Sequence, residues 1–224
     1  MYKMARSGVG ALILAAGLSS RMQPILHGGS KALFPLGGVS MLEHCYALFT
    51  RAGIENITVV TGHDSESVAP LAMALGAHTV HNDNYTDGMF GSITCGLQSL
   101  AHSACAGVFL LPVDMALVRL AVVKSMLQSW NVLGKGQKEY IYVPAINGAW
   151  GHPPLIGRGH WDAIASWSGE GGLQGYMLRS MKVGGGGREA LRIVPVEDEG
   201  ILRDIDTPDD ARLASEYIEK GRLE

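Results

Sequence analysis

The sequence predicts an α/β protein with a mostly parallel central sheet. Short apolar runs alternate along the chain with longer segments that follow helix-capping signals, and strands that alternate with helices indicate βαβ units. The chain also has enough apolar side chain for a sizeable core, since 47% of its 224 residues are hydrophobic and 17% are charged.

Strands are expected at the apolar runs. Residues 9–16 form a run long enough for a buried strand, and residues 57–61 are rich in β-branched side chains, which favour strands. Residues 107–112 form a second strongly apolar run. Further strands are expected at residues 77–81, 140–144 and 191–196.

Helices are expected where capping signals precede apolar segments. Ser40 and Glu43 make a capping box that begins a helix through about Arg51. Thr207 at the cap and Pro208 at the first helical position begin the last helix. Other helices are expected at residues 64–75 with Asp64 as the cap, 92–100, 118–130, 159–166 and 172–181.

The remaining segments predict one domain over residues 1–224, because no repeat or convincing linker divides them. Residues 1–8 are expected to be a flexible leader, and residues 23–30 a polar, glycine-bearing excursion. Residues 82–91 are expected to be a loop, and the glycines at 184–187 a flexible link.

Composition excludes several function classes. The net charge of −3 and the lack of a basic block argue against a nucleic-acid partner. No run of 18 apolar residues exists, so no membrane span is expected. Cys45, Cys95 and Cys105 are odd in number and contain no C-x-x-C pair, which favours the reducing cytoplasm and gives no zinc pattern.

The loop after the first strand is the strongest chemical signal. A buried strand that runs into Gly17, Ser19 and Ser20 offers free backbone N–H groups at the carboxyl end of the sheet, where α/β folds bind ligands and where phosphate oxygens fit. Arg21 and Lys31 add positive charge. The alternative is an ordinary strand-to-helix turn whose glycine supplies only a positive φ.

Carboxylates follow two later strands. Asp114 comes just after the strand at 107–112, where a divalent cation would relieve its repulsion of a bound polyphosphate; the alternative is a helix cap. Asp204 and Asp206 lie two residues apart in an extended segment, so both project to one face. One of them would be a second metal ligand, or both would be solvated beside the last helix.

Several motifs together resemble those of a known family. LAAGLSSRM at 14–22 and KALFPLGG at 31–38 resemble the opening signature of the nucleotidyltransferases. PVDM at 112–115 resembles their metal-aspartate motif, and GHPP at 151–154 and DIDTPDD at 204–210 are similar to motifs of the MobA/MocA-like molybdenum-cofactor branch. GHPP favours the cytidylyltransferase side of that branch.

The resemblance implies a Rossmann-like three-layer fold of the nucleotide-diphospho-sugar transferase type. It implies transfer of a nucleoside monophosphate from a nucleoside triphosphate to a phosphate-bearing acceptor, with Mg²⁺ as cofactor. Arg21, Lys31 and Asp114 would be catalytic, and Asp114 and Asp206 would hold the metal. The nucleotide contacts that it implies are Leu14, Ala15, Ala16, Gly17, Ser19, Ser20, Arg21, Lys31, Ser92 and Gly96.

Two further residues have alternatives of equal standing. Ser92 is expected beside the base of the nucleotide, or else caps a helix. His152 is expected to orient the phosphate or the pterin of the acceptor, or else serves the structure of its loop. The chain also departs from the family pattern, because Gln23 stands where glycine is usual and ten positions separate Arg21 from Lys31.

The expected reaction is CMP transfer from CTP, favoured over GTP, to an acceptor of the molybdopterin type, with release of pyrophosphate. A rival reaction moves GMP or another nucleotide, or uses a phosphosugar or an alcohol phosphate as acceptor. A non-catalytic accessory protein that binds a nucleotide and delivers a cofactor is the other alternative. Transient contact with a molybdoenzyme or its chaperone is expected in either case.

Overall fold

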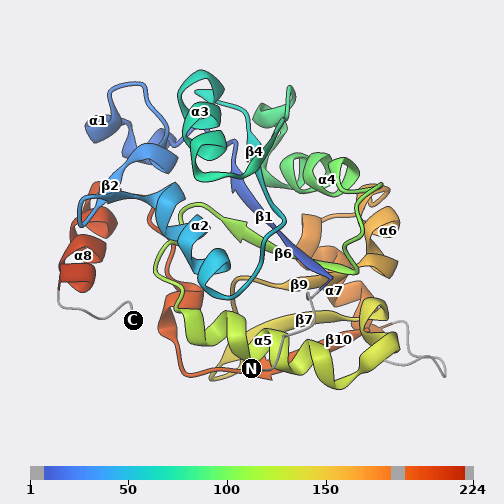
Figure 1. The fold of residues 1–224 in the computed structure, drawn as a ribbon. Coiled ribbons are helices and arrows are strands. Elements are labelled where there is room, and N and C mark those ends of the chain that lie inside the picture. Colours follow the sequence, from blue (N-terminus) through green and yellow to red (C-terminus); the bar gives the residue numbers. More distant parts are fainter. Residues whose placement is uncertain (1–7, 183–189, 220–224) are drawn as a thin grey trace.

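A computed structural model describes residues 8–182 and 190–219, and it has an eight-stranded central sheet (Figure 1). The strand order is β10-β7-β9-β6-β1-β4-β5, with β8 paired to β7. Within the described part of this sheet, β8 and β9 are antiparallel to their neighbours and the other pairings are parallel. The strands are β1 (Val9–Ala15), β4 (Ile57–Thr61), β5 (His78–His81), β6 (Gly107–Pro112), β7 (Ile141–Ile146), β8 (Ala149–Trp150), β9 (Leu155–Gly157) and β10 (Leu191–Pro195).

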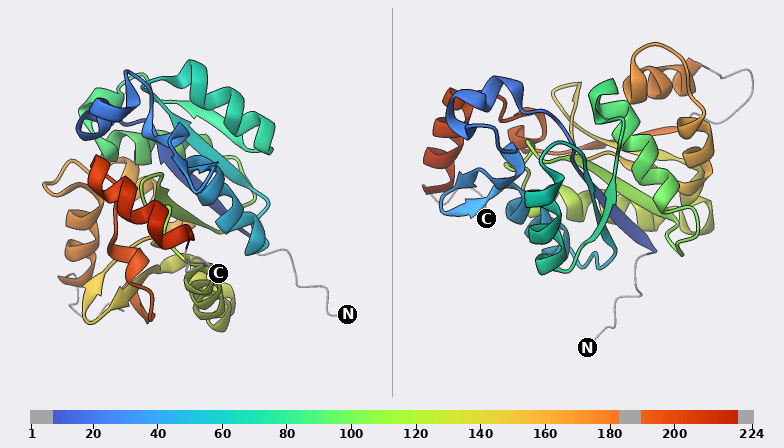
Figure 2. Two further views of the ribbon diagram at one scale, coloured as in Figure 1. Left: turned by 90° about the vertical axis from the view of Figure 1, so that its left-hand side faces the viewer. Right: turned by 90° about the horizontal axis from the view of Figure 1, so that it is seen from above.

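Helices cover both faces of the sheet, which confirms the expected three-layer α/β fold. Helices α2, α3, α5 and α8 pack on one face, and α4, α6 and α7 pack on the other, as the left view of Figure 2 shows for α6 and α7 against α2 and α5. The helices are α1 (Gln23–Leu26), α2 (Met41–Arg51), α3 (Ser65–Leu75), α4 (Met89–Ser99), α5 (Leu120–Val132), α6 (Trp161–Ala165), α7 (Gly172–Lys182) and α8 (Pro208–Glu219).

Strand β1 is the centre of this arrangement, because it pairs in parallel with β4 on one side and β6 on the other. Its seven residues are all buried. Ala11 and Ile13 belong to the apolar cluster on one face of the sheet, and Leu12 and Leu14 to the cluster on the other. The period of two in a strand therefore explains why an unbroken apolar run is needed here.

Two capping predictions are confirmed. Ser40 accepts a hydrogen bond from the Glu43 backbone N–H at 3.2 Å, and the Glu43 carboxylate accepts from the Ser40 N–H at 2.9 Å. Thr207 and Asp210 repeat this reciprocal pattern at α8, where the Asp210 N–H donates to Thr207 Oγ1 at 3.2 Å. Each pair satisfies backbone N–H groups that a helix start leaves unpaired.

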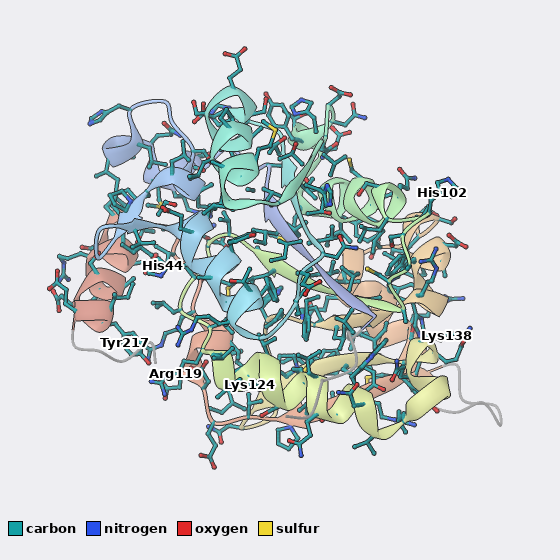
Figure 3. All side chains as sticks on the ribbon, viewed as in Figure 1. His44, His102, Arg119, Lys124, Lys138 and Tyr217 are labelled. Carbon is teal, nitrogen blue, oxygen red and sulfur yellow. The ribbon has the colours of Figure 1, made fainter. Side chains whose placement is uncertain are left out.

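Helix α8 is held on its face of the sheet by a contact to the start of α5. The Arg119 guanidinium donates a hydrogen bond to the Tyr217 hydroxyl, and the two labelled side chains lie next to each other in Figure 3. The Arg119 backbone N–H donates to Asp198 at 2.8 Å. These contacts fix the segment before α8, which carries Asp204 and Asp206.

Other details differ from expectation. Helix α4 begins at Met89, three residues before Ser92, because Gly88 takes up the turn with φ 101°. Asp64 stands at the start of α3 but makes no side-chain cap; its carboxylate accepts from the Ser30 N–H and the Ser67 hydroxyl instead. The hairpin β2 (Pro35–Leu36) and β3 (Val39–Ser40), the strands β8 and β9, and helix α1 were not expected.

Two expectations concern residues that the structure does not describe: the flexible leader, apart from Gly8, and the link at 184–187. In the described part of the chain, no helix has both the length and the apolar character needed to cross a membrane.

Candidate active site

The loop after β1 keeps its backbone N–H groups unpaired. Those of Gly17, Leu18 and Ser19 donate to no described protein acceptor, and the three residues line a cavity of about 320 Å³. Gly17 is not at positive φ; Ser19 is, at φ 55°. A Cβ on Gly17 would meet no described protein atom within 4 Å. The alternative that Gly17 serves only a positive φ is therefore wrong, and its bare surface leaves room for a ligand.

Gln23 closes the excursion that separates this loop from Lys31. Its side-chain amide donates to the carbonyl oxygens of Leu18 and Gly29, each at 3.2 Å, and its Oε1 accepts from the Gly28 N–H at 2.8 Å. Ser19 Oγ then accepts from the Lys31 N–H at 3.1 Å. One side chain thus ties both ends of the excursion together, and Lys31 comes back beside the loop despite the ten intervening positions.

Removing this clamp is expected to weaken nucleotide binding more than catalysis. In Gln23→Ala, three hydrogen bonds that shape the loop are lost, so we expect KM for the nucleotide to rise about 10-fold with kcat changed less than about 3-fold. Gln98→Ala, an exposed change on α4, is the matched control and should leave both constants unchanged. Steady-state kinetics decide; a normal KM in Gln23→Ala would contradict the role of the clamp.

Four charged side chains meet at the carboxyl ends of β1 and β6. Lys31 Nζ donates to Asp114 Oδ2 and to Asp206 Oδ1, both at 2.6 Å. The Arg21 guanidinium donates to the other oxygen of Asp206. The side chains of Lys31, Asp114 and Asp206 are each 13% exposed, while Arg21 is 69% exposed. The structure therefore brings together residues 21, 31, 114 and 206, as the sequence predicted.

The cluster perturbs its own protonation. Partial burial acts to lower the pKa of Lys31, but Asp114 and Asp206 outweigh it and the net shift is upward. Partial burial acts to raise the pKa of Asp206, but Lys31 and then Arg21 outweigh it and the net shift is downward. Burial raises the pKa of Asp204, and its hydrogen bond with Asp206 adds to the rise. Lys31 and Asp206 thus stay charged over a wide pH range.

Asp206, rather than Asp204, shares the Lys31 ammonium with Asp114. The alternative that Asp114 caps the next helix is wrong, because α5 begins six residues beyond it, with Arg119 at the N-cap. Two carboxylates beside a loop with free backbone N–H groups suit Mg²⁺, which protein sites commonly hold by one or two carboxylates together with substrate phosphates. A cluster of three or more metal-binding side chains does not occur among the described residues.

Ser92 lies on the far wall of the cavity, 4% exposed, on the first turn of α4. The alternative that Ser92 caps this helix is wrong, since Gly88 occupies the cap. Gly96 does not line the cavity: a Cβ there would come within 2.8 Å of Leu12 Cδ1 and 3.0 Å of Val60 Cγ2. Packing of α4 against the sheet explains Gly96, and we do not retain it among the nucleotide contacts.

His152 lies beside the four charges. It lines a cleft of about 530 Å³ together with Arg21, Lys31, Asp114 and Asp206, and it borders an apolar recess of about 400 Å³. Burial lowers the pKa of His152, although the charge of Asp114 opposes this. Its Nδ1 is buried and has no hydrogen-bond partner in the described chain. A buried ring nitrogen without a partner is what an absent ligand would leave behind.

Sequence reasoning missed three contributors to this site. The Gln23 clamp and Asn82, which donates to Ser92 Oγ at 3.0 Å, act through other residues. Tyr85 lies in the cavity wall within a segment that looks like an ordinary polar loop. The only signal in the sequence was the departure from the family pattern at Gln23.

Comparison with known proteins gives a family match over most of the chain. A family model described as the MobA-like NTP transferase domain matches residues 11–183. The choline-phosphate cytidylyltransferase of Haemophilus influenzae is 26% identical over 67% of this chain and 68% of its own. Across the first curated relatives that it matches, the aligned part covers 12% to 68% of their length.

Solved structures share the fold. CMP:2-keto-3-deoxy-manno-octonic acid synthetase complexed with CTP superposes with a TM-score of 0.73 at 15% identity, over 95% of this chain and 99% of that one. Rv0371c of Mycobacterium tuberculosis, in a complex with manganese, gives a TM-score of 0.67 at 22% identity, over 95% of this chain and all of that one.

Proposed function

Because the chain belongs to the MobA-like NTP transferase family and is thus a nucleotidyltransferase, we propose that it moves CMP from CTP to a phosphate-bearing acceptor of the molybdopterin type. The observation that carries this proposal is the meeting of Lys31, Asp114 and Asp206 at the rim of the cavity lined by the Gly17 loop. Phosphoryl transfer depends mainly on positioning and charge stabilisation, and such a cluster supplies both.

In this proposal the loop from Leu14 to Ser20 binds the nucleotide, with its free N–H groups directed at phosphate oxygens. Arg21 and Lys31 stabilise the negative charge that develops on the departing pyrophosphate. No protein nucleophile is required, since an oxygen of the acceptor phosphate attacks the α-phosphorus, the bond to the pyrophosphate breaks, and the bonding electrons leave with it.

The proposal includes Mg²⁺ as cofactor. Asp114 and Asp206 would hold it, and their carboxylate oxygens fit a hard cation. When bound, the ion supplies Lewis-acid stabilisation of phosphate charge. The complex of a fold relative with manganese supports a divalent cation in general terms.

The acceptor is assigned to the cleft next to the charges. Its phosphate would reach the cluster past His152, and its body would enter the recess lined by Phe90, Ile93, Val143, Trp150, Leu173 and Met177, among others. That recess is apolar and offers Trp150 for stacking, which suits a planar ring such as a pterin. Transient contact with a molybdoenzyme or its chaperone, a cytoplasmic location and a single domain over residues 1–224 complete the proposal.

A second acceptor class is an alcohol phosphate such as phosphocholine, since the cytidylyltransferase relative carries that name. Phe90 and Trp150 in the recess suit a quaternary ammonium group through cation–π contact as well as a pterin through stacking. We place the pterin first because GHPP at 151–154 and DIDTPDD at 204–210 resemble motifs of the molybdenum-cofactor branch.

The test is pyrophosphate release with CTP, GTP, UTP and ATP, each paired with molybdopterin, phosphocholine and a sugar phosphate. We expect release with CTP and molybdopterin, and none when Mg²⁺ is chelated. Preference for GTP or for another acceptor would overturn the finer assignment. Tight nucleotide binding without turnover for any pair would favour the accessory role instead.

His152 gives a prediction about the acceptor alone. Since its Nδ1 is buried without a hydrogen-bond partner and the residue lines the proposed acceptor cleft, His152→Leu is expected to raise KM for the acceptor about 10-fold, with KM for CTP unchanged. His152→Asn carries a polar atom near the position of Nδ1 and should restore most of the affinity. Equal acceptor kinetics in wild type and His152→Leu would contradict this role.

A further inference from the structure

Ser92 lines the proposed nucleotide cavity, and the hydrogen of its hydroxyl has no acceptor among the described residues. Ser92 lines the cavity on helix α4, and its Oγ accepts a hydrogen bond from Asn82 Nδ2 at 3.0 Å. A hydroxyl has one hydrogen to donate and lone pairs to accept with. The Asn82 contact uses a lone pair, so the hydrogen is left to point elsewhere.

Three other helical serines donate this hydrogen to a carbonyl of their own helix. Ser99 donates to the Gly96 carbonyl at 2.7 Å, and Ser180 and Ser215 donate to carbonyls four residues earlier, each at 2.9 Å. Ser92 makes no such bond to any acceptor in the described chain, although it is 4% exposed. The hydroxyl is therefore a buried donor without a partner, and the cavity is the space that it borders.

The side-chain amide of Asn82 is fixed in one orientation by its other hydrogen bonds. Asn82 is 5% exposed, and its Oδ1 accepts from the Asn84 N–H at 3.1 Å. Its backbone N–H donates to the Thr61 carbonyl at 2.8 Å, which anchors the residue at the end of β4. Because the side-chain oxygen is committed to Asn84, the NH₂ group has to face Ser92.

We propose that Asn82 is a positioning residue that makes Ser92 an obligate hydrogen-bond donor to the base of the nucleotide. The ligand atom that meets Ser92 is then an acceptor, a base carbonyl oxygen or an unprotonated ring nitrogen. Cytosine offers both on one edge, at O2 and N3. This inference rests on the proposed function, since it takes the cavity at the Gly17 loop as the nucleotide site.

The matched variant for the test is Asn82→Asp. It is isosteric and keeps an oxygen for the Asn84 N–H, but it places an acceptor where the NH₂ group stood. The Ser92 hydroxyl then donates to residue 82 and turns its lone pairs towards the base, which reverses the polarity of the contact. A residue that only shapes the turn at 82–84 would tolerate this change, because the turn keeps its hydrogen bond.

Calorimetric binding of CTP with Mg²⁺, without acceptor, is the readout, and Ser92→Ala, Asn82→Ala and both double variants complete the cycle. We expect Kd to rise about 30-fold in Asn82→Asp and about 5-fold in Asn82→Ala, the scale of an unpaired buried group and of a loosened hydrogen bond respectively. In the Ser92→Ala background, each change at Asn82 should alter Kd less than about 2-fold. Asn84→Ala, an exposed change two residues away, is the control.

The outcomes separate this inference from the function on which it rests. Equal losses from Asn82 changes with and without the Ser92 hydroxyl would overturn the inference alone. Failure of the wild-type protein to bind any nucleoside triphosphate would overturn the proposed function, and the inference with it. Melting temperatures identify a variant that does not fold; should Asn82→Asp be one, the alanine cycle still decides by its coupling.

Discussion

Replacing Asp114 with asparagine is expected to lower kcat for nucleotidyl transfer by about 10³-fold, the largest effect of any single change considered for this protein. The carboxylate stands 2.6 Å from the Lys31 ammonium beside the Gly17 loop, where the proposed function places the triphosphate and the charge that develops on it during transfer. Asparagine keeps the size of the side chain but removes its negative charge, so the cluster loses one of its two proposed metal ligands. The loss should therefore appear in the chemical step.

In the absence of divalent cations, the same substitution is expected to raise the affinity for the nucleotide, although it lowers kcat in their presence. In a chelating buffer, the Asp114 carboxylate repels the triphosphate, and Asp114→Asn removes that repulsion. We expect metal-free CTP to bind the variant more tightly than the wild type, by about 3-fold or more, the scale of one charge contact screened by solvent and salt. A general loss of structure would weaken binding instead, so the sign of this change tests the assignment.

Asp162→Asn is the control for this experiment, since Asp162 is an exposed carboxylate on α6, away from the cluster. It should match the wild type in turnover and in metal-free binding. Near-normal turnover of Asp114→Asn in the same assay would remove Asp114 from the proposed catalytic machinery.

Much of this site follows from strand ends, and that part could be predicted from the sequence. Asp114 comes after a strand that is apolar throughout, and the Gly17 loop comes after another, so their convergence at one sheet edge needs only that both strands run parallel. Asp206 could be foreseen less well, because its position depends on how the segment after β10 crosses back towards β6. The contact of the Ile205 N–H with the Asp114 carbonyl at 3.0 Å makes that crossing, and no local pattern announces it.

The features of the site and fold that the sequence did not predict depend on short-range contacts in loops and on very short elements. Gln23 occupies a position where the family pattern has glycine. Its side chain holds the loop through hydrogen bonds to three backbone groups, and the sequence does not identify those partners. The contact of Asn82 with Ser92 could not be predicted, because the sequence places the start of the helix at Ser92. In the structure α4 begins at Met89, and its first turn brings Ser92 beside Asn82. Antiparallel β9 is three residues long, too short for its own alternation to be recognised.

Lys31→Met is expected to have two effects of opposite kind. It removes a cation that is proposed to stabilise the negative charge developing on the pyrophosphate, so kcat/KM should fall about 10²- to 10³-fold. At the same time, the affinity for a divalent cation in the absence of nucleotide should rise. The reason is that Lys31 Nζ lies 2.6 Å from both carboxylates that are proposed to hold the metal, and its ammonium competes with the ion for them.

The competition is constant over the working pH range. The pKa of Lys31 is raised above the ordinary 10.5 and that of Asp206 is lowered below the ordinary 3.8, so both charges persist between these values. For Asp206 the lowered pKa means that its ion pair stabilises the fold above pH 3.8, a contribution lost as the pH falls through the lower, folded value. The metal affinity of Lys31→Met should thus exceed that of the wild type at every neutral pH tested.

Free Mn²⁺, followed by its electron paramagnetic resonance signal, measures this affinity without any turnover. We expect Lys31→Met to bind Mn²⁺ at least about 5-fold more tightly than the wild type, on the scale of one partly screened charge contact. Lys124 is an exposed lysine on α5 that Figure 3 labels, and Lys124→Met is the matched control. This control should leave both kcat/KM and the affinity for Mn²⁺ unchanged. Weaker Mn²⁺ binding in Lys31→Met would mean that the lysine supports the metal site instead of occupying it. Unchanged binding would mean that the ion is held away from Asp114 and Asp206, because a cation between those carboxylates has to displace the ammonium that now joins them.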